Sequence, residues 1–111
     1  MNSIVKGNIF TLPGQDKSGN ETIEILAQGS SLIERIVSYG HTTPENFWYN
    51  QENDEWVVLI QGEAILLFED NETITLTSGD YIFIPAGRKH KVTFTSNTPP
   101  CIWIAVHGNL S

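Results

Sequence analysis

Residues 79–90, GDYIFIPAGRKH, place a glycine, a proline, a second glycine and a histidine at the spacing G-x5-P-x-G-x2-H. Gly79 suits a tight turn into a strand, and Pro85 ends that strand because it has no backbone N–H to donate. Gly87 lets the chain reverse, so that His90 opens the next strand. Side-chain alternation along that strand can direct His90 into the interior. The spacing therefore predicts two short strands joined by a turn, with one histidine aimed inward.

The chain on both sides of this stretch also consists of short β segments separated by turn residues. Thr73–Thr77 alternates polar and apolar residues with the period of a half-buried strand, and Trp56–Gln61 is dense in β-branched and aromatic residues. No stretch holds a helical stripe for three turns. We expect strands at residues 22–26, 32–39, 56–61, 64–68, 73–77, 81–84, 91–95 and 101–106. Closely spaced strands of this kind indicate a sandwich or a barrel.

A second spaced pattern lies upstream, where Glu55–Gly62 reads EWVVLIQG with the spacing E-x6-G. Together the two patterns resemble the signature motifs of the cupin superfamily, over roughly residues 32–107. The first cupin motif usually carries H-x-H before E-x6-G, and three spacer residues place Tyr49 and Gln51 at those histidine positions. The second motif usually has Asn four residues after its histidine, where this chain has Phe94. The run FWYNQ that ends at Gln51 also resembles small, single-domain bacterial cupins.

The resemblance implies an all-β, double-stranded β-helix, the cupin jelly-roll barrel, as a single domain over residues 1–111. Its core would span about residues 32–107, with N-terminal strands within residues 1–31. Cupins are often homodimers, and many hold one divalent metal through two or three His and one Glu at the barrel mouth. They include dioxygenases, isomerases, epimerases, decarboxylases and sugar- or effector-binding domains. The fold alone selects none of these activities.

Composition narrows the classes of partner. The 111 residues carry a formal net charge of −7, with six Lys and Arg against thirteen Asp and Glu. Phosphate backbones and anionic lipid surfaces repel such a chain, so we expect a small-molecule ligand rather than nucleic acid or a membrane. The one cysteine, Cys101, lies in an apolar run and is expected to be buried. The absence of a signal-peptide pattern and of a long apolar run favours a cytoplasmic protein.

Gln51, Glu55 and His90 are the candidate metal ligands. They offer an amide oxygen, a carboxylate and an imidazole, a set that resembles the facial arrangements that hold Fe(II), Mn(II) or Ni(II) with open positions. Zinc remains among the metals considered, although zinc sites usually have more nitrogen or sulfur ligands. One alternative is a metal-free polar network among the same three side chains. Another is a metal-free pocket for an organic ligand.

Tyr49 and Phe94 are the candidate residues of a substrate pocket. The pKa of a tyrosine, about 10, makes Tyr49 a poor metal ligand at neutral pH, so we expect it to line the pocket. Strand alternation places Phe94 on the same face as His90. A phenylalanine at that position would make the floor of the pocket more apolar than the usual asparagine.

The sequence also predicts the environment of four other charged or titratable side chains. His41 and His107 stand at the ends of elements, where either could replace a missing ligand and where solvation is the simpler expectation. Arg35 and Arg88 are expected to be surface or rim charges rather than substrate clamps. The three tryptophans are expected to pack in the core or at a dimer interface.

Three functions fit these residues, and the sequence leaves open whether the protein is an enzyme. The first is a divalent-metal-dependent enzyme acting on a small organic substrate. The second is a non-catalytic ligand-binding or sensor cupin without metal. The third is metal-free acid–base catalysis by Glu55 and His90, for example an isomerisation.

Overall fold

The computed structural model describes residues 3–15 and 19–111. These residues contain no helix, and hence none that could cross a membrane. Their strands, in chain order, are β1 (Thr22–Gln28), β2 (Leu32–Ser38), β3 (Asp54–Gln61), β4 (Glu63–Phe68), β5 (Thr73–Thr77), β6 (Tyr81–Ile84), β7 (His90–Thr95) and β8 (Cys101–Gly108). Each of the strands predicted from the sequence is therefore confirmed, with ends that differ by at most two residues.

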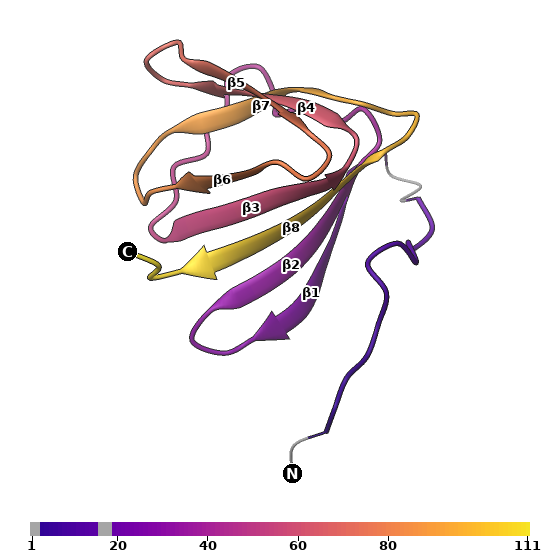
Figure 1. Cartoon of the computed structure of the whole chain (residues 1–111). Helices are drawn as coiled ribbons and strands as arrows, with labels where there is room; N and C mark the ends of the chain where they lie inside the picture. Colours follow the sequence, from indigo (N-terminus) through magenta and orange to yellow (C-terminus); the bar gives the residue numbers. More distant parts are fainter. Residues whose placement is uncertain (1–2, 16–18) are drawn as a thin grey trace.

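The strands form two antiparallel sheets that face each other (Figure 1). The larger sheet has the order β1-β2-β8-β3-β6, and the smaller has the order β5-β4-β7. From β3 onward the chain passes repeatedly from one sheet to the other, so strands distant in sequence become neighbours. This arrangement is the all-β, double-stranded β-helix expected from the resemblance.

The core lies between the sheets, at the positions that strand alternation points inward. Five strands contribute its fully packed side chains: Val57, Leu59, Ala64, Leu66, Phe68, Leu76, Ile84, Cys101, Trp103 and Ala105. Burying one large apolar side chain contributes about 1.5–3 kcal/mol, so this cluster is the main source of stability. Cys101 is fully buried, as predicted.

Gly62 joins β3 to β4 and carries the chain from the larger sheet to the smaller one. Its φ of 102° lies in a region that residues with a Cβ rarely adopt. A Cβ at this position would also lie 2.8 Å from Cys101 Sγ and 2.8 Å from Ser96 Oγ. The final position of the E-x6-G pattern therefore requires glycine for both its backbone angle and its lack of a side chain.

A β-bulge in β7 reverses the predicted orientation of Phe94. Two consecutive residues of β4 lie opposite Phe94 and Val92, which leaves Thr93 as an extra residue in β7. The extra residue shifts the alternation, so that Thr95 is 4% exposed and Phe94 is 43% exposed. The prediction that Phe94 lines the pocket is therefore wrong, because alternation continues only where the pairing is regular.

Arg35, which lies in β2, binds the backbone of the N-terminal segment around residues 8–11. This differs from the expectation that Arg35 is a surface or rim charge. The residue is 7% exposed. Its Nη1 donates to the carbonyl oxygens of Asn8, Ile9 and Thr11 at 2.9–3.0 Å. Its Nη2 lies 2.6 Å from Glu24 Oε1. Arg35 thus satisfies the backbone of a segment that belongs to neither sheet.

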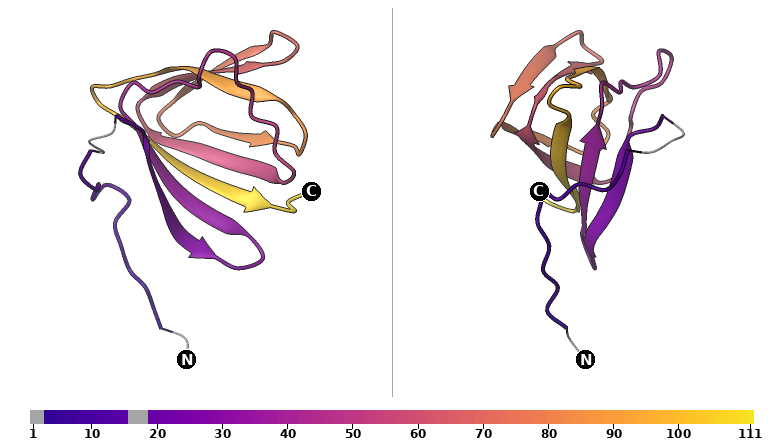
Figure 2. Two further views of the ribbon diagram at one scale, coloured as in Figure 1. Left: turned by 180° about the vertical axis from the view of Figure 1, so that it is seen from behind. Right: turned by 90° about the vertical axis from the view of Figure 1, so that its right-hand side faces the viewer.

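The segment before this anchor extends away from the two sheets (Figure 2). Its side chains Ile4 and Val5 are 98% and 87% exposed. Within the described part of residues 1–31, β1 is the one strand, whereas more than one strand was predicted there. Residues 1–2 and 16–18 lie outside the described residues.

Candidate functional site

The two spaced patterns of the sequence meet at the start of β7. Tyr49 and His90 form an isolated antiparallel bridge, with Tyr49 N 2.8 Å from His90 O and His90 N 3.1 Å from Tyr49 O. Gly87 N donates to Gln51 O at 2.9 Å. Asp54 accepts a further backbone hydrogen bond from the same turn at 2.9 Å. These bonds hold the segment before β3 against the turn before β7, and so bring both patterns to one place.

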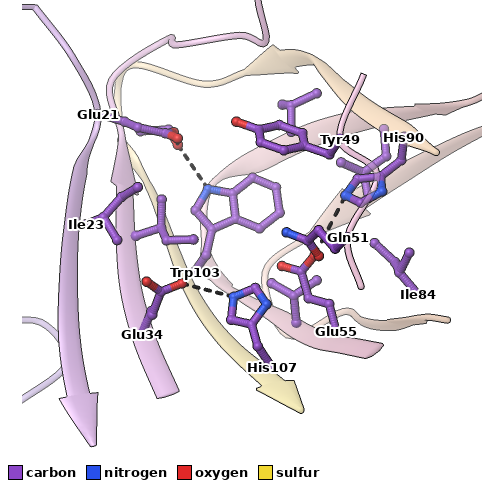
Figure 3. Close-up of a pocket in the computed structure, with 15 residues that line it drawn as sticks. Glu21, Ile23, Glu34, Tyr49, Gln51, Glu55, Ile84, His90, Trp103 and His107 are labelled. Atoms are coloured by element: carbon purple, nitrogen blue, oxygen red, sulfur yellow. Dashed lines mark hydrogen bonds and ion pairs between the residues drawn. The ribbon is translucent and has the colours of Figure 1, made fainter. Parts of the chain in front are cut away.

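A cavity of about 160 Å³ lies between the sheets at this junction (Figure 3). Its apolar walls are Ile23, Ile36, Val57, Leu66, Ile84 and Val92. Its polar and aromatic lining residues are Glu21, Glu34, Ser38, Tyr49, Gln51, Glu55, His90, Trp103 and His107. A concave, largely apolar lining with a few convergent polar groups is typical of a small-molecule site.

Glu55 and His90 face each other inside the cavity, with Glu55 Oε1 3.7 Å from His90 Nε2. His90 Nδ1 lies 3.0 Å from the carbonyl oxygen of Arg88. Because a carbonyl oxygen only accepts, Nδ1 carries a hydrogen. In the neutral imidazole, Nε2 therefore presents its lone pair to the Glu55 carboxylate. A proton or another cation between these two acceptors would satisfy both.

The environment of Glu55 favours the protonated carboxyl. Burial raises its pKa above the ordinary value of 4.5, because desolvation disfavours the charged form. The nearby imidazoles of His107 and His90 oppose this rise, and the carboxylate of Glu34 adds to it. The residue is 8% exposed, and no described residue donates a hydrogen bond to its side chain. Glu55 therefore holds a proton more tightly than an exposed glutamate.

His107 lines the cavity, although the simpler expectation from the sequence was a solvated histidine. Its side chain is 15% exposed, and its Nε2 lies 2.9 Å from Glu34 Oε1. It lies directly opposite Glu55 in the pairing of β8 with β3. The predicted strand ended one residue before His107. Extending its alternation from Trp103 would have pointed His107 inward.

Tyr49 and Trp103 give the cavity its aromatic surface. Trp103 Nε1 donates to Ser38 Oγ at 3.1 Å, and Ser38 Oγ donates to Glu21 Oε2 at 2.9 Å. This chain fixes the indole and brings the Glu21 carboxylate to the cavity. Burial, together with the charges of Glu21 and Glu55, raises the pKa of the Tyr49 phenol above 10.0. The phenol therefore stays protonated at neutral pH.

The structure brings Gln51, Glu55, His90 and Tyr49 to one cavity. Their roles as metal ligands and as a substrate pocket remain predictions. His41 does not line the cavity, and its Nδ1 accepts a backbone N–H two residues before it at 2.9 Å. Within residues 3–15 and 19–111, no three His, Cys, Asp or Glu side chains are grouped closely enough to hold a metal ion.

Comparison with known proteins identifies the family. The cupin domain model matches residues 35–107, about two-thirds of the chain. This chain belongs to the cupin family. The uncharacterized protein YdbB of Bacillus subtilis (strain 168) is 26% identical to this cupin over 85 residues, which cover 76% of this chain and 72% of YdbB.

Solved structures agree with this cupin assignment. A protein from Ralstonia eutropha JMP134, provisionally named a mannose-6-phosphate isomerase, is 33% identical, with a TM-score of 0.87 over 96% of this chain and 99% of that chain. A cupin superfamily protein from Desulfitobacterium hafniense DCB-2 is 16% identical, with a TM-score of 0.73 over 91% of this chain and 86% of that chain. At the lower identity the likeness concerns the fold alone.

The donor set of this cupin differs from the one that its family commonly uses. Tyr49 and Gln51 occupy the positions of the two first-motif histidines, and the raised pKa of Tyr49 argues against a phenolate ligand. His107 Nε2 is paired with a carboxylate of β2. The remaining donors are the Gln51 amide, the Glu55 carboxylate and the His90 imidazole. They fit a divalent ion, with fewer strong ligands than the two or three histidines of the family pattern.

Proposed function

We propose that this cupin binds a small polar organic molecule in the cavity and that Glu55 and His90 act on it as an acid–base pair. The observation that carries the proposal is the buried Glu55 carboxyl, which faces His90 Nε2 at 3.7 Å and has no hydrogen bond from a described residue. A ligand group placed there would contact both side chains. A carboxyl whose pKa is raised inside a cavity is also typical of functional sites.

Proton transfer is the reaction class that this pair supports. The raised pKa of Glu55 brings its titration closer to neutral pH, where a group can both accept and release a proton efficiently. On a substrate with a hydroxyl group beside its carbonyl, one group takes the proton from the hydroxyl-bearing carbon while the other protonates the carbonyl oxygen, which gives an enediol. The first group then returns its proton to the former carbonyl carbon while the second takes the proton of the remaining original hydroxyl, which becomes the new carbonyl, so both groups are restored and no redox partner is needed. The provisional isomerase name of the R. eutropha protein supports this class and leaves the substrate open.

A divalent metal is the second candidate, with Gln51, Glu55 and His90 as ligands. The contact of His90 Nδ1 with the Arg88 carbonyl oxygen favours it, because such contacts orient histidines that bind metals. Iron, manganese, nickel or zinc bound at this place would polarise a substrate carbonyl or hydroxyl group.

Metal analysis separates the two candidates. Protein purified without chelators is measured by inductively coupled plasma mass spectrometry, alongside Glu55→Ala and His90→Ala. Stoichiometric metal that disappears in both variants supports the metal site. Turnover that survives EDTA but is lost in His90→Gln supports the metal-free acid–base pair.

A thermal-shift screen of small organic compounds tests binding itself. A ligand selective for the native state raises stability by about 2.7 kcal/mol at a concentration of one hundred times Kd. We expect stabilising compounds whose effect falls in Glu55→Gln and persists in Glu69→Gln, which changes an exposed carboxylate outside the cavity. Stabilisation without chemical change of the ligand would identify a non-catalytic binding cupin. Stabilisation that is the same in both variants would contradict the proposed site.

A further inference from the structure

We infer that the cavity selects a small organic cation, an ammonium compound, as its ligand. This inference rests on the proposed function, because it names the ligand class of the same site. Three carboxylates line the cavity, those of Glu21, Glu34 and Glu55, and the lining among the described residues contains no Lys or Arg. They come from the segment before β1, from β2 and from β3, so they approach from different sides (Figure 3).

Among the described residues, Glu21 has no positively charged partner, and the partner of Glu55 is a histidine at a longer distance. Glu34 is paired with His107 at 2.9 Å, which accounts for that charge when the histidine is protonated. Glu21 accepts from the neutral Ser38 hydroxyl at 2.9 Å. Glu55 has only the longer contact of 3.7 Å with His90 and no hydrogen bond from a described residue. The polar part of the cavity therefore presents more negative than positive charge to a ligand.

The walls suit an organic rather than a hydrated inorganic cation. The Trp103 indole and the Tyr49 phenol both face the cavity, and aromatic faces attract ammonium groups with a strength that grows as water is removed. Trp103 is 5% exposed, and its indole is held by Ser38, so this surface is preformed. The apolar side chains around it favour the carbon skeleton of the ligand.

The same charges disfavour a phosphorylated sugar. The provisional name of the R. eutropha protein refers to a substrate with a phosphate group. A phosphate needs cationic or N–H donors such as arginine, which present several hydrogen bonds to it. Three carboxylates without a lining Lys or Arg would repel it. This cupin is therefore expected to take a different class of ligand.

Isothermal titration calorimetry with a matched pair of compounds tests the inference. Choline and 3,3-dimethylbutan-1-ol have the same shape and differ in charge, and both have few enough atoms for a cavity of about 160 Å³. Ethanolamine serves as a smaller cation, and mannose 6-phosphate as the anionic comparison. We expect at least one of the two cations to bind at least tenfold more tightly than the neutral alcohol, a difference of about 1.4 kcal/mol. Mannose 6-phosphate should give no binding.

Matched variants identify which carboxylates contribute to binding of the cation. Glu21→Gln and Glu55→Gln should each weaken binding of the cation at least fivefold, and by a larger factor than they weaken binding of the neutral alcohol. Glu69→Gln removes the same charge from an exposed position outside the cavity and should change nothing, so it controls for the net charge of the protein. Circular dichroism of each variant checks that it is folded.

Three results would overturn the inference. They are a neutral alcohol that binds as tightly as both cations, no binding of either cation, and a loss of binding in Glu69→Gln as large as in Glu21→Gln. Failure of the proposed function is distinguishable, because then no compound of any charge would depend on Glu55 and His90. Neutral compounds that bind through these two residues would preserve the proposed function and refute the cationic ligand.

Discussion

Replacing Glu55 by Gln is expected to stabilise the protein at neutral pH, even though it removes the ionisable carboxyl from the proposed site. The folded-state pKa of Glu55 lies above its ordinary value of 4.5. The stability that this protonated carboxyl contributes is therefore fully present below that value and is lost as the pH rises through the folded-state pKa. Glutamine keeps the shape and never ionises, so the variant does not undergo this loss.

The magnitude follows from the burial and contacts of the side chain. Burying a polar group without a hydrogen bond costs about 1–3 kcal/mol in mutational data, and a charged group costs more, so we expect the ionised carboxylate to exceed the neutral glutamine amide by a cost of this order. Glu55 is 8% exposed, and His90 Nε2 lies 3.7 Å from its carboxylate, so this contact offsets only part of the cost of burying the charge. We therefore expect Glu55→Gln to increase the free energy of unfolding by about 1–3 kcal/mol at pH 7.5. For a domain of this size that corresponds to a rise in Tm of roughly 4–12 °C.

Urea denaturation at several pH values measures this effect. Wild type, Glu55→Gln and the exposed control Glu69→Gln are compared between pH 4 and pH 7.5 in a buffer that contains EDTA. The difference between Glu55→Gln and wild type should be small at pH 4 and should grow with pH, whereas Glu69→Gln should stay within about 0.5 kcal/mol of wild type. A Glu55→Gln variant less stable than wild type at pH 7.5, or a difference independent of pH, would refute the reasoning.

Other substitutions test the residues that support the cavity and the expected dimer. Gly62→Ala should lose about 2–5 kcal/mol, from backbone strain at φ 102° and from atoms 2.8 Å from the new Cβ, and a loss under 1 kcal/mol in denaturation would contradict this. Asp54 accepts three hydrogen bonds that lower its pKa, so Asp54→Asn should reduce Tm at pH 7, and by less as the pH falls through that lowered value. The exposed Ile4 and Val5 are expected to contact a second copy, so replacing both by Ser should convert a dimer to a monomer in light scattering. A wild-type monomer at every concentration would disprove this last expectation.

The fold follows largely from local signals in the sequence. Alternation over Thr73–Thr77 and the turn residues around Gly79 are properties of a few neighbouring residues, and they fix where strands begin and end. The position of His90 is also local, since the preceding proline and glycine end one strand and reverse the chain. These signals explain why the strands and the inward histidine were predictable.

The parts that the sequence did not predict depend on pairing between distant strands. Phe94 turns outward because β7 gains an extra residue against β4, and nothing in the sequence around Phe94 marks that bulge. Arg35 is buried because a segment without strand structure crosses its strand and supplies carbonyl acceptors. Glu34 and His107 meet because β2 and β8 are neighbours, an arrangement set by the whole sheet.

The claim on which this account rests is that a small organic molecule occupies the cavity between the two sheets, in contact with Glu55 and His90. Nuclear Overhauser effects between a saturating ligand, choline or the tightest compound of the thermal-shift screen, and assigned methyl groups test it directly. We predict contacts with Ile36, Val57 and Val92, which line the cavity, and their loss in His90→Gln. Contacts confined to surface methyl groups that do not line the cavity, with none to these three residues, would contradict the account.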